Sequence, residues 1–193
     1  SMIMGTAGFT ALQCSFTTKT TREELLLGEK VVNVIVSGAS GGVGSMAVMI
    51  LNKLGCDVTA VTGKDDNGEY LKSLGAKNVV KTSELMKDSR PLDRGLWDGA
   101  VDTVGGKVLE NILSQTKDAG IVAACGNAAD IKLNTTVMPF IIRGVKLWGI
   151  NSVNASIKRR QFLWNEAGKL IDFELLLKSV KEINLEEVID IYP

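Results

Sequence analysis

A run of glycines at residues 38–44 is the part of the sequence with the clearest capacity for chemistry. It reads Gly-Ala-Ser-Gly-Gly-Val-Gly, follows an apolar β-branched run at 31–37 and opens an amphipathic stretch at 42–54. Backbone N–H groups at a helix N-terminus bind phosphate, and glycines there allow a tight turn and close approach of the ligand. Ala39 departs from the strict G-x-G-x-x-G pattern, and the Gly-Lys-Ser/Thr ending of a P-loop is missing. We therefore predict a dinucleotide pyrophosphate site, with a glycine-rich turn that binds nothing as the alternative.

The end of the second apolar run indicates which dinucleotide to expect. An NAD-preferring site places a carboxylate there, about 20 residues past the glycines, to hold the ribose hydroxyls. This sequence has Thr62, Gly63 and Lys64 instead, so that a hydroxyl and an ammonium face the place of a 2′-phosphate. Asp65 and Asp66 are the rival candidates, but they fall past the turn, where Asp commonly caps the next helix. We predict NADPH as the cofactor, with an ordinary solvated lysine as the alternative for Lys64.

The elements that must position these residues alternate along the chain. Short, mostly apolar runs predict six strands, at 31–37, 57–62, 78–81, 97–102, 120–125 and 145–150. Helical patterns lie at 42–54, 68–74, 107–115, 139–143, 155–171 and 173–181, and a further one begins at 185–191. Runs that are apolar on both faces are typical of parallel strands covered by helices. The predicted fold is therefore α/β, a doubly wound parallel six-stranded sheet (Rossmann fold), with residues 1–193 as one NAD(P)-binding domain.

Composition and charge exclude several other classes of function. Lys plus Arg equals Asp plus Glu at 22 each, so no overall charge attracts nucleic acid or an anionic membrane. Histidine is absent, which excludes Ser-His-Asp triads and the commonest zinc ligand. The three cysteines, Cys14, Cys56 and Cys125, show no disulfide or zinc spacing. We expect a cytoplasmic protein without a bound metal, and the Ser-Met start and the abrupt Tyr-Pro end suggest an engineered fragment.

Several segments together resemble one family. They are MGTAGFTA at 4–11, SGASGGVGS at 37–45, EYLKSLGA at 69–76, WDGAVDTVG at 97–105, ACGN at 124–127, TTVMPFIIR at 135–143 and GINSV at 149–153. The set resembles the zinc-free quinone oxidoreductase branch of the medium-chain dehydrogenases/reductases, and in particular the YhdH/YhfP group, which includes acrylyl-coenzyme A reductases. The resemblance implies a two-domain subunit of which this chain is the cofactor domain, with the flanking catalytic-domain segments absent. It also implies a homodimer formed through the sixth strand.

The resemblance assigns roles to particular residues. Those implied to hold the cofactor are Gly41, Gly42 and Val43 at the pyrophosphate, Thr62, Gly63 and Lys64 at the 2′-phosphate, Ser40 and Thr82 near the adenosine, and Thr103, Val104, Asn127, Ile142 and Ser152 beside the nicotinamide. The family often has arginine at the position of Lys64. Lysine keeps the positive charge there but cannot form the bidentate hydrogen bonds to phosphate that a guanidinium forms. Strand termination explains Thr103 and Ser152 equally well, and core packing explains Ile142. No residue is identified as the proton donor, and the catalytic residues stay unknown.

The activity implied by the resemblance is hydride transfer from NADPH to an alkene conjugated to a carbonyl. An acyl-coenzyme A thioester such as acryloyl-CoA is the first substrate, and a quinone or enone the second. The fragment alone is expected to be inactive, because half of the cleft would be missing. A non-catalytic NAD(P)-sensing module is the alternative. A short-chain dehydrogenase is excluded, since neither Tyr70 nor Tyr192 is followed by lysine four residues later.

Overall fold

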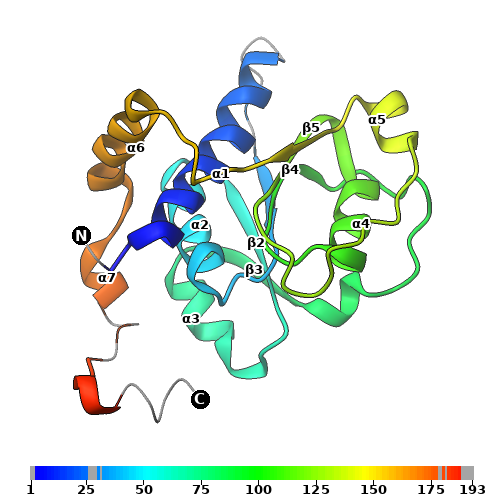
Figure 1. The fold of residues 1–193 in the computed structure, drawn as a ribbon. Coiled ribbons are helices and arrows are strands. Elements are labelled where there is room, and N and C mark those ends of the chain that lie inside the picture. Colours follow the sequence, from blue (N-terminus) through cyan, green and yellow to red (C-terminus); the bar gives the residue numbers. More distant parts are fainter. Residues whose placement is uncertain (1–2, 26–29, 31, 178–179, 181, 188–193) are drawn as a thin grey trace.

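A single parallel sheet forms the centre of the molecule (Figure 1). The computed structural model describes residues 3–25, 30, 32–177, 180 and 182–187. The strands are β1 (Asn33–Val36), β2 (Asp57–Thr62), β3 (Ala76–Lys81), β4 (Trp97–Asp102), β5 (Thr116–Ala124) and β6 (Lys146–Gly149). Their order across the sheet is β3-β2-β1-β4-β5-β6, with every pairing parallel. This order reverses between β1 and β4, as in a dinucleotide-binding Rossmann fold, and confirms the predicted fold class.

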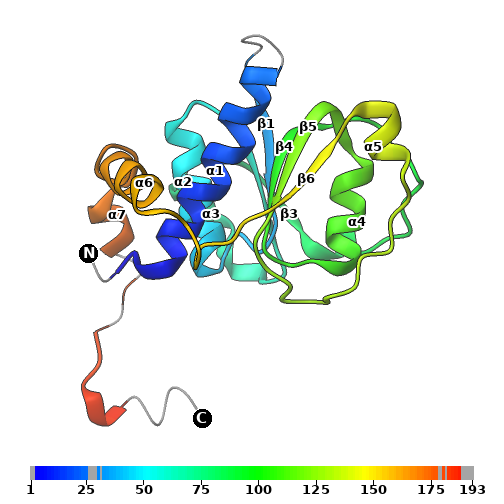
Figure 2. The ribbon, with the colours of Figure 1, turned by 45° about the horizontal axis from the view of Figure 1, so that its top comes forward.

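Helices cover both faces of the sheet (Figure 2). One face carries α1 (Gly5–Leu25), α2 (Gly42–Lys53), α3 (Gly68–Ser73), α6 (Ile157–Leu170) and α7 (Phe173–Leu177). The other carries α4 (Gly106–Ser114) and α5 (Met138–Arg143). Short 3₁₀ turns lie at η1 (Asp65–Asn67), η2 (Thr82–Leu85) and η3 (Leu185–Glu187). The two layers bury separate apolar clusters against the sheet, which is the arrangement that crossover connections between parallel strands produce.

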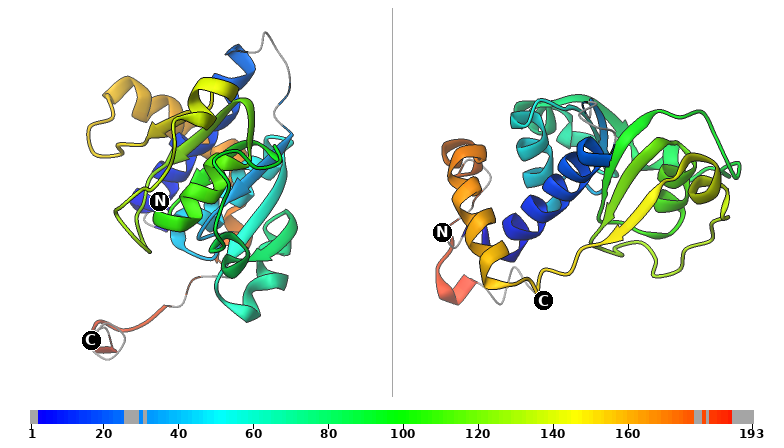
Figure 3. Two further views of the ribbon diagram at one scale, coloured as in Figure 1. Left: turned by 90° about the vertical axis from the view of Figure 1, so that its right-hand side faces the viewer. Right: turned by 90° about the horizontal axis from the view of Figure 1, so that it is seen from above.

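Helix α1 is an element that the sequence did not reveal. Six of its 21 residues are threonines, which have low helix propensity, and it carries no acidic residue in its first turn. It is nevertheless packed between the sheet and α6 (Figure 3), with Leu12 and Cys14 fully buried. Thr18 donates a hydrogen bond to the Ala100 carbonyl (3.1 Å), and a Cβ on Gly99 would lie 2.2 Å from the Thr18 methyl group. Tertiary packing therefore stabilises α1 despite its weak propensity.

The predicted boundaries hold within a few residues, but the two edge strands are more exposed than predicted. β3 and β6 were expected to be buried on both faces, whereas most of their side chains are exposed or half-buried. An edge strand has a neighbour on one side only, and the flanking helices reach it incompletely. The pattern at 173–181 is confirmed as helix only to Leu177, and that at 185–191 only as the turn η3; residues 178, 179, 181 and 188–193 lie outside the described residues.

Glycine ends two of the helices at the edge where β2 and β3 begin. Gly55 follows α2 with φ +83°, and Gly75 follows α3 with φ +103°. Both values lie in the left-handed region that other residues rarely adopt, so these glycines stop the helices as predicted. None of the described helices is both long enough and apolar enough to pass through a bilayer.

Candidate nucleotide-binding site

The glycine loop connects β1 to α2 at the carboxyl edge of the sheet. Its turn is held by a hydrogen bond from the Gly41 N–H to the Gly38 carbonyl (2.9 Å), and Gly38 has φ +59°. Gly41 is the N-cap of α2, and no side chain of the described residues caps this helix end. Gly41 and Gly42 are exposed, so the first N–H groups of α2 face a surface that the protein's own side chains leave open. Such a helix end is suited to bind an anion.

The loop after β4 packs directly against this glycine turn. The Thr103 hydroxyl donates to the Ser37 carbonyl (3.0 Å), and the Thr103 N–H donates to the Ser37 hydroxyl (3.0 Å). A Cβ on Gly38 would lie 2.2 Å from the Thr103 hydroxyl and 3.2 Å from a Val104 methyl group. Thr103 and Val104 are half-buried and stand beside the glycine loop, as expected for residues at adjacent strand ends. Whether they contact a nicotinamide stays a prediction.

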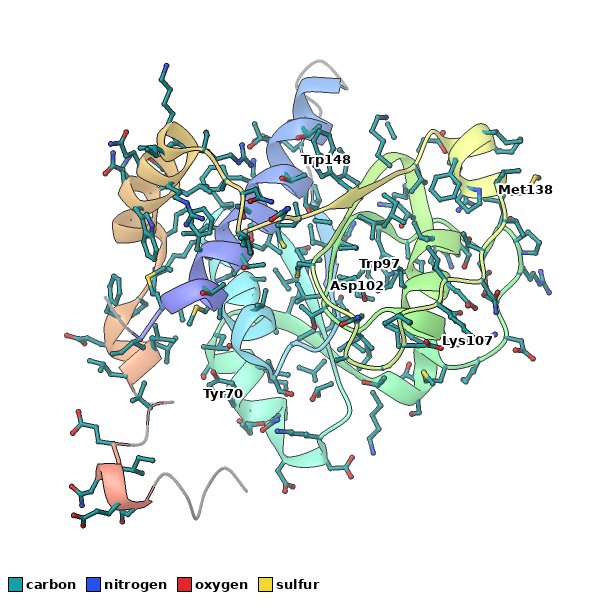
Figure 4. All side chains as sticks on the ribbon, viewed as in Figure 1. Tyr70, Trp97, Asp102, Lys107, Met138 and Trp148 are labelled. Carbon is teal, nitrogen blue, oxygen red and sulfur yellow. The ribbon has the colours of Figure 1, made fainter. Side chains whose placement is uncertain are left out.

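Asp102, the last residue of β4, is hydrogen-bonded to both the start of the glycine loop and the loop after β4. It lies near the centre of the molecule (Figure 4) and is fully buried. Its carboxylate accepts hydrogen bonds from the Ser37 hydroxyl (2.6 Å), the Gly105 N–H (2.9 Å) and the Val104 N–H (3.5 Å). Burial raises the pKa of Asp102, and these three hydrogen bonds act in the opposite direction. Asp102 therefore has a positioning role, because all of these partners belong to the protein itself.

The end of β2 brings together residues that the sequence assigned to the adenosine side. The hydroxyls of Ser40 and Thr62 lie 3.1 Å apart, and the Lys64 N–H donates to the Thr62 hydroxyl (3.1 Å). Thr82 is adjacent, since a Cβ on Gly63 would lie 3.6 Å from its hydroxyl. Thr62 is buried, whereas Gly63 and Lys64 are exposed. The structure thus brings all five residues to one place beside the glycine loop.

A cavity of about 250 Å³ opens at this same edge and carries two cations that the sequence analysis missed. Lys72 of α3 and Lys81 of β3 line it together with Thr62, Lys64 and Asp65. Lys81 was identifiable in principle, because it ends a predicted strand and its neighbour in the sheet is Thr62. Lys72 was not, since its approach depends on how α3 packs. Three lysines against one carboxylate make this cavity positively charged.

Asp65 and Asp66 lie past the turn, as predicted, but they do not cap the next helix. They form the first turn of η1, and neither η1 nor α3 has a side-chain cap. Asp65 instead pairs with Lys81 (2.8 Å), and this partner lowers the pKa of Asp65. The expectation of a cap is therefore wrong, because Asp65 is ion-paired with Lys81 of β3 and neither carboxylate caps η1 or α3.

Two of the residues expected beside a nicotinamide also lie at this edge. Asn127 follows β5 and is exposed; its Cα would lie 3.3 Å from a Cβ on Gly105. Ser152 follows β6, and its hydroxyl is hydrogen-bonded to that of Thr10 in α1 (2.6 Å). Arg160 of α6 donates to the Ser152 carbonyl (2.8 Å) and holds this loop in place. Neither placement tests whether these residues contact a cofactor.

Ile142 is not brought to the site. It is 59% exposed on α5, which precedes β6 and therefore lies at the amino edge of the sheet. The next residue, Arg143, donates to the carbonyls of Ser114 (2.9 Å) and Thr116 (3.0 Å), where β5 begins. These hydrogen bonds hold α5 at the amino edge of the sheet, whereas the glycine loop lies at the carboxyl edge. The alternative of a core residue also fails, because the side chain points to solvent.

The site offers hydrogen-bond donors and cations but few groups for acid–base chemistry. Histidine is absent from the sequence, and Asp102 is enclosed by its own hydrogen bonds. Within the described part of the chain, no group of three or more His, Cys, Asp or Glu side chains could hold a metal ion. The arrangement can thus bind and orient a phosphorylated ligand, and the chemistry would come from that ligand.

The sequence profile of one family, described as zinc-binding dehydrogenase, matches residues 42–168, which run from the glycine loop into α6. The chain belongs to the zinc-binding dehydrogenase family. Zinc independence, which the resemblance implied, stays a prediction for this member.

Three relatives of this chain indicate which group within the family it resembles. The probable acrylyl-CoA reductase AcuI of Escherichia coli (strain K12) is 46% identical over 97% of this chain and 56% of its own length. The yhdH oxidoreductase of Salmonella enterica, solved in complex with NADP, is 44% identical with a TM-score of 0.90 over 98% of this chain and 57% of its own. Bacillus subtilis yhfP, solved with NAD bound, is 39% identical with a TM-score of 0.87 over the same shares.

These similarities confirm the resemblance to the YhdH/YhfP group and do not favour a non-catalytic sensing module. The chain spans little more than half of the length of each of these relatives.

Proposed function

We propose that this chain is the NADPH-binding domain of a longer two-domain reductase that reduces an activated carbon–carbon double bond. The observation that carries the proposal is the pairing of an uncapped, exposed α2 N-terminus with a lysine-lined cavity at the end of the next strand. The first binds a pyrophosphate, and the second binds a 2′-phosphate. The Salmonella enterica relative solved with NADP supports the cofactor, and the likeness to an acrylyl-CoA reductase supports the substrate class, an acyl-coenzyme A thioester or a quinone.

In this proposal the residues of the chain bind and orient the cofactor. The N–H groups of Gly42 and Val43 hold the pyrophosphate, and Lys64 with Thr62 holds the 2′-phosphate. Thr103, Val104, Asn127 and Ser152 lie at the ends of later strands, where they can flank a nicotinamide. The bound cofactor supplies the hydride, and the chain fixes its ring against the acceptor. Protonation of the product needs a donor outside this set, because the described strand ends offer no histidine and no free carboxylic acid.

Calorimetric titration with NADPH and NADH tests the proposal. The chain is expected to bind NADPH more tightly than NADH. Lys64→Glu should weaken NADPH binding about 10- to 100-fold, since it replaces a charge-assisted hydrogen bond by repulsion, and should leave NADH binding unchanged or tighter. The comparison of the two cofactors matters because one relative, Bacillus subtilis yhfP, was solved with NAD bound.

Lys53→Glu is the matched control. Lys53 is an exposed lysine at the last turn of α2, at the opposite edge of the sheet, and the same charge change there should leave both affinities unaltered. Tighter binding of NADH than NADPH by the unchanged chain would contradict the assignment of the cavity. Equal losses in both lysine variants would show that only net charge matters.

We also propose that the protein is cytoplasmic and forms a homodimer through β6. The two sheet edges differ: β3 exposes Lys77 and Lys81, whereas β6 exposes Leu147 and Trp148. Charged residues discourage pairing between edge strands, and apolar ones permit it. Light scattering should find a dimer that Trp148→Asp dissociates and that Ile131→Asp, a change at an even more exposed apolar residue away from β6, leaves intact. A monomeric unchanged chain would refute the dimer.

A further inference from the structure

The cavity at the end of β2 contains one carboxylate that does not suit a phosphate site. Of the described residues that line this cavity of about 250 Å³, Asp65 is the single acidic one, and it shares the space with Lys64, Lys72 and Lys81. A carboxylate repels a phosphate, and in NAD-preferring sites a carboxylate after the second strand holds the ribose hydroxyls instead. A free Asp65 would therefore oppose the binding of NADPH and assist the binding of NADH.

Lys81 holds this carboxylate in an ion pair. Its Nζ lies 2.8 Å from Oδ1 of Asp65. The two side chains meet because β2 and β3 are parallel neighbours, in which Lys81 is paired with Thr62, three residues before Asp65. Each partner shifts the pKa of the other toward the charged form, lowering the pKa of Asp65 and raising the pKa of Lys81. The carboxylate is thus neutralised by a residue of the neighbouring strand.

The ion pair has little part in holding the fold together. The side chains of Lys81 and Asp65 are 70% and 76% exposed. Exposed ion pairs contribute little to stability, because water and salt screen them. Substitutions at either residue should therefore leave the domain folded. What the pair changes is the charge that a ligand meets in the cavity.

The cations of the cavity consequently differ in role. Lys72 lies 3.9 Å from Glu69, a neighbour on its own helix α3 that is not part of the cavity lining. Lys72 can turn to a phosphate without freeing a carboxylate inside the cavity. Lys81 cannot, since any movement away from Asp65 leaves that carboxylate uncompensated next to the ligand.

We propose that Lys81 is a specificity-determining residue, which by its ion pair with Asp65 prevents that carboxylate from repelling the 2′-phosphate of NADPH. This inference rests on the proposed binding of NADPH and adds a second determinant to Lys64. Loss of Lys81 has opposite consequences for the two cofactors. NADPH then meets a repelling carboxylate, whereas the 2′-hydroxyl of NADH gains an acceptor for a hydrogen bond.

A double-mutant cycle on the 193-residue chain, measured by calorimetric titration with NADPH and NADH, tests this role. Lys81→Met should weaken NADPH binding about 10-fold, as expected for one uncompensated charge near a phosphate at the protein surface, and should tighten NADH binding. Asp65→Asn should leave NADPH binding unchanged or tighter. The double variant should bind NADPH within about 3-fold of the unchanged chain, because the carboxylate that Lys81 neutralises is removed as well.

Lys77→Met and Asp57→Asn form the matched control cycle. Their ion pair (2.5 Å) also joins exposed side chains of β3 and β2, but it lies where the two strands begin, at the opposite edge of the sheet from the cavity. The charge changes are the same as in the test cycle. Because the distance to the cavity exceeds the range of screened charges, the control variants should alter neither affinity by more than about 2-fold.

Three results would contradict the inference, and they separate it from the proposed function. If Lys81→Met binds NADPH as tightly as Lys77→Met does, Lys81 is no determinant, while a preference of the unchanged chain for NADPH would still support the proposed function. If the double variant is as weak as Lys81→Met alone, Lys81 contacts the phosphate directly instead of neutralising Asp65. If the unchanged chain binds neither cofactor, the proposed function is refuted together with this inference.

Discussion

Gly44→Ala is expected to destabilise the domain by about 3 kcal/mol or more, a large part of the stability of a typical domain. A Cβ at residue 44 would lie 2.3 Å from the Gly38 carbonyl oxygen and 2.7 Å from the Ala39 Cα. Both are backbone atoms of the loop between β1 and α2, so no side-chain rotation can relieve the overlap. Either α2 moves away from β1 or the loop opens, and each displaces fully buried residues such as Ala47 and Val36.

Gly42→Ala is the matched control two residues earlier in the same helix. Its Cβ would meet only the Ala7 methyl group, at 3.4 Å, which is ordinary contact. Because alanine has the higher helix propensity, this variant should be about as stable as the unchanged chain or slightly more stable. Urea unfolding followed by circular dichroism measures both. A Gly44→Ala variant as stable as Gly42→Ala would show that the loop does not pack as described.

The second large effect is expected at Asp102. Asp102→Ala should lower the free energy of unfolding by about 2–4 kcal/mol at neutral pH, because the buried Ser37 hydroxyl and the Gly105 N–H both lose their acceptor. Asp66→Ala, at an exposed carboxylate of η1, should change it by about 0.5 kcal/mol or less. The same unfolding experiment decides between a positioning residue and a dispensable one. Equal stability of the two variants would remove Asp102 from the organisation of the site.

The pH dependence of Asp102 has a definite sign. Its pKa in the folded chain is raised by burial, so the native state holds the proton more firmly than the unfolded state does. The resulting stabilisation is complete below the unfolded pKa of about 3.9 and is lost as the pH rises through the folded value. We therefore expect the free energy of unfolding of the unchanged chain to exceed that of Asp102→Asn at low pH. This difference between the two chains should shrink as the pH rises. An advantage that grows instead would mean that the hydrogen bonds outweigh burial.

The sequence by itself determined the strands, the glycine loop and the location of Lys64, because each is encoded by a local pattern. Apolar runs, a glycine string between a strand and a helix, and the residue at a strand end are all properties of neighbouring positions. Helix α1 was not predicted from the sequence, because its stability comes from packing on β4 and β5 rather than from helix propensity.

Only the tertiary structure decided which distant residues share an edge of the sheet. Parallel strands and their crossover helices carry Lys72 and Lys81 to the cavity beside Lys64, and they carry Ile142 to the opposite edge. They also enclose Asp102 with its donors. These outcomes depend on strand order and register, which are set by the whole core and not by any single segment.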